Sequence, residues 1–328
     1  MKKSVPNRHL KIYGCILFSL VIPFAYTLYC ITTSMTPPPY ELNPSPLGYT
    51  KSLSIFAVPI LFFWIWIFFH PEYKIERRAY FGTILGVFFL GSFLDIFFGY
   101  SFFYFPNTES YLGIMIPSFS FKTWQFVLGY LPIEEFGFYF LGATYMISLY
   151  LWGVVFWFRR YNHQNHGQVC KDADKIFVFN PVALGLCLGI CALGFIIKKL
   201  GPYPDGFPGY FFFQVLVMFL PLILVYSSLK YFINWRAFSF MSFLLLLVSI
   251  VYEATIGVPY GMWKYKTEQM LGILITGWSD LPIEATLLWI AAAFGTVLVF
   301  EFLRTYFYMD RPLRQAVVGR KEPANKTQ

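Results

Sequence analysis

Long apolar runs separated by short polar stretches make up most of this chain. An apolar helix needs about 20 residues to cross the roughly 30 Å hydrocarbon core of a bilayer. Eight runs approach or exceed that length, at about 11–31, 53–70, 79–104, 126–158, 180–199, 210–233, 237–257 and 281–307. The first run is too long for the apolar part of a secretory signal, and no small-residue cleavage site follows it. The pattern predicts an all-α, polytopic membrane protein with about eight transmembrane helices.

Composition and charge support a membrane location and predict an orientation. Hydrophobic residues make up 57% of the chain and charged residues 13%, which is unusual for a soluble domain. With the N-terminus in the cytoplasm, most Lys and Arg residues fall on cytoplasmic loops. The basic residues that fall outside are Lys51, Lys122, Lys198, Lys199, Lys264 and Lys266. We therefore expect a multi-pass protein of the cell membrane with both termini cytoplasmic. The net charge of +8 reflects this topology, so nucleic acid is not an expected partner.

Several features occur twice in the same order, which predicts a tandem duplication. They are the Pro-rich loops 37–46 and 202–208, Pro59 and Pro221, Asp95 with Gly99 and Glu253 with Gly257, and Leu-Pro-Ile-Glu at Leu131–Glu134 and Leu281–Glu284. Each half contains four predicted spans, an even number, so both halves enter and leave on the same side. This arrangement predicts two parallel four-helix repeats.

The duplication defines the expected domain organisation. A first membrane repeat covers residues 1–160, a basic cytoplasmic linker 161–178, a second membrane repeat 179–310, and a basic cytoplasmic tail 311–328.

Carboxylates inside the predicted spans are the candidate catalytic groups. An Asp at the centre of a membrane helix costs on the order of 2.5–3.5 kcal/mol on insertion scales, so repeated intramembrane acids indicate that they have a function in the protein. The predicted topology places Asp95, Glu134, Glu253 and Glu284 in the outer half of the bilayer. Glu135 follows Glu134, whereas the second half has Ala285 at that position, so the halves differ chemically. We expect the first half to perform the chemistry, with Asp95 as the partner acid.

Aromatic residues, 22% of the chain, accumulate at the same predicted depth. An interfacial belt explains many of them. A pocket in which ring faces stabilise a carbocation explains the cluster equally well. Both interpretations remain open, and the candidate substrate-binding residues are Phe98, Tyr139, Trp263 and Tyr265.

Several other kinds of site are not indicated. There is no glycine-rich nucleotide fingerprint, no Asp-rich pair for a magnesium–diphosphate site and no His-rich motif. Cys187 and Cys191 are one helical turn apart, but no His or acidic residue lies near them in the sequence. We therefore expect neither a cofactor nor a metal.

The segment Pro132-Ile133-Glu134-Glu135 resembles the Pro-x-Glu-Glu signature of the lycopene cyclase domain. In the second half, Glu253 to Gly257, Gly261 to Tyr265 and Pro282 to Glu284 are similar to the succession of acid, Gly, Trp-x-Tyr and Pro-x-Glu in that family. The resemblance covers roughly 79–150 and 237–300. Ala285 and the eighth span depart from the pattern of the family.

The resemblance implies an isomerase that cyclises the linear ψ-ends of lycopene into ionone-type rings without redox change. Such a reaction needs an acid to protonate a double bond, a pocket that shelters a cation, and a base. Carried over by motif, Glu134 and Glu135 would be the acid–base residues, with Asp95 in support. The implied partners are a membrane-dissolved carotenoid, the lipid bilayer and other enzymes of the carotenoid pathway.

Four alternatives remain open. A divergent member of the family would modify another polyene or isoprenoid. A carotenoid hydratase would quench the same cation with water. A proton-coupled transporter would use carboxylates nearer mid-bilayer, lining a path that is open to water. In a structural subunit, the acids would only pair with Lys122, Lys198 or Lys264 near the outer surface.

Overall fold

The computed structural model describes residues 45–69, 75–162, 176–309 and 311–319. The predicted first span, 11–31, lies outside these residues, as do most of the predicted linker and half of the predicted tail. Within the described residues, seven helices are long and apolar enough to cross a membrane. They are Gly48–Trp66, Arg77–Phe102, Glu134–Trp157, Pro181–Leu200, Gly209–Leu229, Trp235–Gly257 and Ile283–Met309. This result confirms a mainly helical, membrane-embedded chain.

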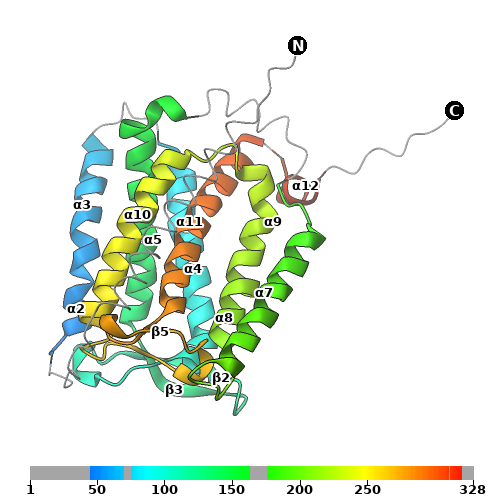
Figure 1. The fold of residues 1–328 in the computed structure, drawn as a ribbon. Coiled ribbons are helices and arrows are strands. Elements are labelled where there is room, and N and C mark those ends of the chain that lie inside the picture. The colour runs from blue at the N-terminus through cyan, green and yellow to red at the C-terminus, as the bar shows by residue number, and fades with distance from the viewer. Residues whose placement is uncertain (1–44, 70–74, 163–175, 310, 320–328) are drawn as a thin grey trace.

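Several of these spans consist of more than one helical segment (Figure 1). The segments are α2 (Gly48–Ser52), α3 (Ser54–Phe69), α4 (Arg77–Phe102), α5 (Glu134–Trp152) with the π-helical turn η2 (Gly153–Trp157), α7 (Pro181–Leu200), α8 (Gly209–Phe213) with π-helical η4 (Gln214–Phe219) and α9 (Leu220–Leu229), α10 (Trp235–Tyr252) with π-helical η5 (Glu253–Gly257), and α11 (Ile283–Met309). A short α12 (Leu313–Val318) follows, and 3₁₀ turns occur at η1 (Thr108–Ser110), η3 (Arg159–Tyr161), η6 (Thr267–Gln269) and η7 (Thr276–Trp278).

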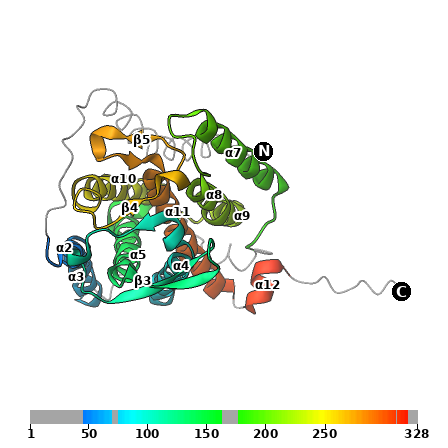
Figure 2. The same ribbon diagram turned by 90° about the horizontal axis from the view of Figure 1, so that it is seen from below.

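Three small antiparallel strand pairs lie together at one end of the helix bundle (Figures 1 and 2). They are β1 (Phe103–Tyr104) with β4 (Lys264–Tyr265), β2 (Met115–Ser120) with β3 (Gln125–Pro132), and β5 (Leu274–Ile275) with β6 (Leu281–Pro282). The strand β3 corrects the predicted start of the fourth span, because residues 125–132 pair with β2 and the helix begins only at Glu134. The chain is therefore not purely helical.

Side-chain caps explain where two of the spans begin. Asn180 Oδ1 accepts hydrogen bonds from the backbone N–H groups of Val182 and Ala183, at 3.0 and 3.2 Å. Pro181 fills the first position of α7, where no intrahelical donor is needed. Asn234 Oδ1 accepts from the backbone N–H of Ala237 at 3.1 Å and caps α10 in the same way.

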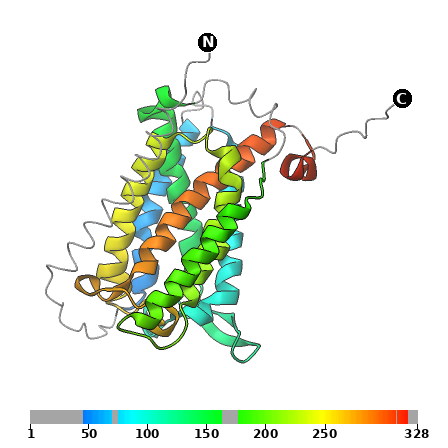
Figure 3. The ribbon, with the colours of Figure 1, turned by 45° about the vertical axis from the view of Figure 1, so that its right-hand side comes forward.

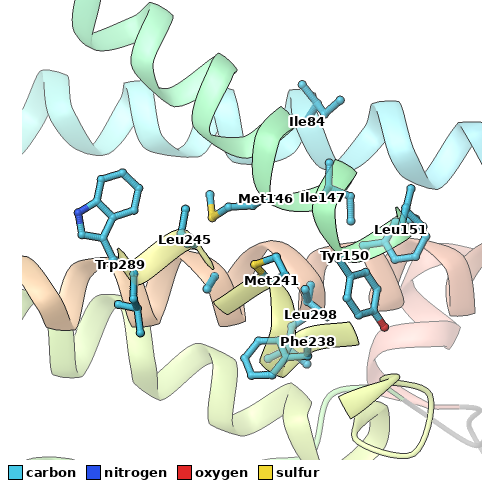
Figure 4. Packing of buried hydrophobic residues seen from close by; sticks show 14 of the residues in the cluster. Ile84, Met146, Ile147, Tyr150, Leu151, Phe238, Met241, Leu245, Trp289 and Leu298 are labelled. Atoms are coloured by element: carbon cyan, nitrogen blue, oxygen red, sulfur yellow. The ribbon is translucent and has the colours of Figure 1, made fainter. Parts of the chain in front are cut away.

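The core lies between α5, α10 and α11, with α4 packed against them. Figure 4 shows Met146, Met241, Leu245 and Leu298 filling the space between these helices, and all four are buried. The outer helices instead expose large apolar side chains, including Phe62 on α3 and Phe89 on α4. In Figure 3, α7 lies along α8 and α9 at the edge of the bundle, which agrees with their contacts. Such contiguous apolar faces are what a lipid environment requires of a transmembrane bundle.

Reciprocal hydrogen bonds join the two halves at the end that carries the strands. Asn107, from the first half, donates through Nδ2 to the carbonyl of Tyr260 at 2.8 Å, just beyond η5. Lys266, from the second half, donates through Nζ to the carbonyl of Tyr100 in the last turn of α4. The backbone N–H of Lys266 also donates to the carbonyl of Phe102 at 2.9 Å. Each half thus supplies donors for carbonyls that the end of a helix leaves unpaired in the other.

Candidate functional site

The helix ends bring the predicted acids to one end of the bundle. Asp95 lies about two turns before the end of α4, and Glu253 is the first residue of η5. Glu134 and Glu135 begin α5, and Glu284 is the second residue of α11. The structure therefore brings these carboxylates to a common level, as the sequence predicted. Their environments, however, differ sharply.

Glu134 and Glu284 each hold a loop beneath their own helix. Glu134 Oε1 accepts hydrogen bonds from the backbone N–H of Leu112 at 2.6 Å and from Thr50 Oγ1 at 2.7 Å. Glu284 Oε1 accepts from the backbone N–H of Leu271 at 2.5 Å. Both side chains are buried. These contacts give the two Leu-Pro-Ile-Glu glutamates a clear role in positioning backbone.

The loops that they hold contain a repeated motif that sequence reasoning missed. Leu-Gly-Ile occurs at Leu112–Ile114 and again at Leu271–Ile273. The central residues, Gly113 and Gly272, have φ values of 82° and 88°, a left-handed conformation that favours glycine. The repeat of this tripeptide was visible in the sequence. The role of the tripeptide becomes clear only from the glutamate that binds its leucine N–H. The separation between leucine and glutamate along the chain differs between the two copies.

Glu135 occupies a different position from Glu134. Tyr49 donates its hydroxyl hydrogen to Glu135 Oε1 at 2.8 Å, from the short helix α2. The Glu135 side chain is only half-buried, whereas Tyr49 is almost completely buried. Asp95 and Glu253 are close enough to Glu135 for their charges to interact with it. The adjacent glutamates therefore separate into a backbone-holding residue and a more accessible acid.

Asp95 is buried and incompletely hydrogen-bonded. Its Oδ2 has no hydrogen-bond partner among the described residues. Tyr139, one of the predicted substrate-binding residues, faces the Asp95 side chain from α5. A Cβ at Gly91 would lie only 2.8 Å from Tyr139 Cδ1, so the absence of a side chain there lets the ring approach α4. Asp95 thus presents an oxygen that can carry and deliver a proton.

Glu253, in contrast, has a donor for each oxygen. Tyr265 O–H donates to Oε2 and Trp289 Nε1–H donates to Oε1, both at 2.5 Å. Burial, followed by the charge of Glu253, raises the pKa of Tyr265 well above its ordinary value, so this tyrosine remains a neutral donor. Two donors on a buried carboxyl group fit an ionised carboxylate.

Aromatic rings pack against one another beside these acids. Phe138 lies 6.2 Å from Trp263 and 5.4 Å from Trp289, measured between ring centroids. Trp263 also lies 5.3 Å from Tyr49 and 5.7 Å from Tyr252. We call Tyr49, Phe138, Tyr252, Trp263 and Trp289 the ring group. The predicted residue Trp263 therefore contacts three other members of the ring group. Tyr265 is linked to the ring group through Glu253, which also binds Trp289.

Phe98 belongs to a neighbouring aromatic cluster and not to the ring group. Its ring lies 5.0 Å from Phe213 and 5.3 Å from Phe121. Phe213 in turn contacts Tyr210 at 6.3 Å, and Tyr210 contacts Tyr265 at the same separation. The structure therefore places Phe98 at the junction of α4 and α8.

No basic side chain neutralises the predicted acids within the described part of the chain. The ion pair found there joins Arg304 Nε to Glu301 Oε2 at 3.3 Å, near the opposite end of α11. Lys198 is buried but donates to the carbonyl of Thr267 at 3.0 Å. Within the same residues, no group of His, Cys, Asp and Glu forms a metal-binding cluster. The geometry disfavours the interpretation in which lysines simply pair with the acids.

The second half lacks the acid that Tyr49 binds in the first half. Gly-Tyr begins both α2 and α8, so Tyr210 occupies the place in α8 that Tyr49 has in α2. The residue after Glu284 is Ala285, and the buried hydroxyl of Tyr210 has no hydrogen-bond partner among the described residues. The predicted chemical difference between the halves is thus visible in their hydrogen bonding.

The arrangement as a whole is a buried group of acids with mixed hydrogen bonding, bordered by aromatic rings. It can donate a proton, accept one and stabilise positive charge between the two events. No protein-family model, no curated protein and no solved structure matches this chain.

Proposed function

We propose that this chain is an integral-membrane isomerase of the lycopene cyclase type, which closes the linear ends of a carotenoid into rings. The observation on which this proposal rests is the position of Glu135. It is a half-buried acid held by Tyr49, close to Asp95 and Glu253, without a basic partner among the described residues. This arrangement suits acid–base chemistry on a hydrocarbon, which offers no polar group for binding.

Two parallel repeats are part of the proposal. The reciprocal contacts of Asn107 and Lys266 support them, because each residue binds the carbonyl end of a helix in the other half. The glutamates Glu134 and Glu284 support them further, since each binds the backbone N–H of the leucine in a Leu-Gly-Ile loop. In this arrangement the ring group and its acids lie where the repeats meet.

The reaction proceeds in three balanced steps. An acid, Glu135 or Asp95, transfers a proton to the terminal double bond, which leaves a tertiary carbocation. The next double bond attacks that cation, and the new carbon–carbon bond closes the ring while the positive charge moves into it. A carboxylate then removes a proton from a carbon beside the charge, so the product has the same formula as the substrate.

The site can stabilise the cation in two ways. The faces of Phe138, Trp263 and Trp289 carry negative quadrupole density, which attracts positive charge in a desolvated site. Glu253, with a donor on each oxygen, can hold a negative charge nearby. Glu134 and Glu284 act here as positioning residues that hold the loops beneath the site.

The level of the acids favours an enzyme over a transporter. Glu135 is the second residue of α5, and Asp95 lies seven residues before the end of α4. A proton-coupled transporter would place its relay acids nearer the middle of the bilayer. The hydratase alternative uses the same acids, and only the product separates it from the cyclase.

Expression in cells that accumulate lycopene tests the proposal. The wild-type chain should convert lycopene to a cyclic product of unchanged mass, whereas a hydratase would add the mass of water. Glu135→Gln should lower conversion by about 10²-fold or more, the usual contribution of a general acid or base. Glu284→Gln serves as the comparator, and conversion should fall less in it. Lycopene that stays linear with the wild-type chain would refute the proposal.

A further inference from the structure

An apolar groove lies in the opposite half of the bundle from the acids. It has a volume of about 470 Å³ and lies between α3, α5 and α10. Seven of its twelve lining residues are aromatic, namely Phe62, Phe63, Trp66, Tyr145, Trp152, Trp157 and Phe240. This volume is within the usual range of small-molecule sites, about 300–1,000 Å³.

Proline and packed rings give the groove its shape. Pro59 lies inside α3 and lacks the N–H that would bond to the carbonyl of Ile55, which allows the helix to bend. Trp66 and Trp152 lie 5.2 Å apart, and Trp157 and Phe240 lie 4.8 Å apart, measured between ring centroids. The walls are thus held by ring–ring contacts from all three helices, and the groove is largely preformed.

The lining offers little to a polar ligand. Ser148 contributes a hydroxyl, but that group is hydrogen-bonded to Tyr80 O–H at 2.9 Å. Tyr80 O–H in turn accepts a hydrogen bond from Trp64 Nε1 at 2.8 Å. The polar groups of Ser148, Tyr80 and Trp64 therefore satisfy one another, and the rest of the lining is formed largely by apolar and aromatic carbon. The chemistry of the lining selects a hydrocarbon.

The groove and the acids lie at different levels along the same helix, α5. Tyr145, at the near end of the groove, follows Glu135 by ten residues, which is about 15 Å of helix. The buried ring of Phe56 links the groove lining to the ring group, because it contacts Tyr145 at 5.5 Å and Phe138 at 6.1 Å. A ligand that extended from Glu135 to Trp157 would run for about 33 Å, close to the thickness of the bilayer core.

We propose that this groove holds the distal hydrocarbon chain of a long linear polyene while its reacting end lies at Glu135. The inference rests on the proposed function and narrows it to substrates nearly as long as the bilayer is thick. Phe56 marks the passage between the reacting end and the chain. A short isoprenoid with the same end group would reach the acids but leave the groove empty.

Substitution of a lining residue tests the groove directly. Leu244 lines the groove on α10, whereas Leu247, one turn along the same helix, is exposed on the outer surface. Leu244→Trp should fill the groove, and Leu247→Trp is the matched control. In protein reconstituted in nanodiscs, lycopene binding is measured by the quenching of tryptophan fluorescence. The added indole would occupy space that the polyene needs, so Leu244→Trp should weaken lycopene binding about tenfold, which is about 1.4 kcal/mol, and Leu247→Trp should bind like the wild type.

A short linear polyene with the same end group should bind equally well to the wild type and to both variants. If Leu244→Trp binds lycopene as tightly as Leu247→Trp does, the groove is not the site of the chain. The binding assay does not depend on turnover, so it separates two kinds of failure. Loss of binding in Leu244→Trp, with no ring closure by the wild type, would uphold the groove and refute the cyclase. Ring closure by the wild type with unchanged binding in Leu244→Trp would uphold the cyclase and refute the groove.

Discussion

At the scale of single residues, a local difference between the halves decides where the chemistry is proposed. Tyr49 donates to Glu135, whereas the buried hydroxyl of Tyr210 has no hydrogen-bond partner among the described residues. The adjacent Glu134 and Glu135 could not be assigned separate roles from sequence. Their roles depend on Leu112 and Tyr49, which come from distant segments.

Matched tyrosine substitutions test this difference. Tyr49→Phe removes a buried donor from the half-buried Glu135, and the loss of such a hydrogen bond should lower the free energy of unfolding by about 1–3 kcal/mol. Tyr210→Phe removes a buried hydroxyl that has no hydrogen-bond partner in the described part of the chain, so it should be neutral or stabilising. Thermal unfolding in detergent measures both variants. Equal destabilisation by the two substitutions would contradict the assignment.

Trp289 tests the hydrogen bonding of Glu253. Trp289→Phe keeps a ring beside Phe138 but removes the N–H that binds Glu253 Oε1. We expect stability to fall by about 1–3 kcal/mol and ring closure to slow, because a buried carboxylate oxygen loses its donor. Trp124→Phe, at the exposed tip between β2 and β3, is the control and should change neither property. If Trp289→Phe behaved like the control, Glu253 would not need this donor.

At the scale of elements, helix ends determine the site more than helix faces do. Apolar run length predicted the described spans well, because hydrocarbon thickness limits both the length and the composition of a spanning helix. It failed at residues 125–132, an apolar stretch that pairs with β2 as a strand. Strand pairing depends on a distant partner, and the apolar composition of β3 does not reveal it. The Leu-Gly-Ile loops were missed for a similar reason, since their role depends on hydrogen bonds to Glu134 and Glu284, which follow later in the chain.

Lys266 predicts a pH dependence at the junction of the halves. Burial lowers the pKa of its ammonium group, although Glu268 opposes the shift. The unfolded chain therefore keeps this proton to higher pH than the folded chain does. Between the lowered folded pKa and the ordinary lysine value of about 10.4, the free energy of unfolding should increase with pH.

Comparison with Lys266→Met isolates this contribution. The stability of the wild type relative to Lys266→Met, measured by denaturant unfolding at several pH values, should rise as the pH approaches the ordinary lysine value. Titration of other groups is common to both proteins and cancels in the difference. A difference that stays constant or falls over this range would show that Lys266 is not destabilised by burial.

At the scale of the whole molecule, segments from the two ends of the described chain pack together around the proposed acid site. Residues of one half bind helix ends of the other through Asn107 and Lys266, and aromatic rings from both halves meet at Trp263. The position of the acids toward one end of their helices was predictable, because it follows from helix direction, whereas their depth in the bilayer stays a prediction. The separation of Phe98 from Glu135 was not predictable, since it depends on how α4 packs against α8. Membrane topology constrains the depth of each residue in the bilayer, but it does not constrain the rotation of a helix about its own axis.

The most direct test of the central claim is to run the reaction in D₂O. If a carboxyl group of the protein starts ring closure by protonating the terminal double bond, each ring formed should carry one deuterium from exchanged acid, and its mass should increase by one unit. Membranes with the wild-type chain and added lycopene, analysed by mass spectrometry, provide this measurement, with Glu135→Gln as the control. A cyclic product without deuterium would contradict the acid mechanism, and a product that had gained D₂O would identify a hydratase instead.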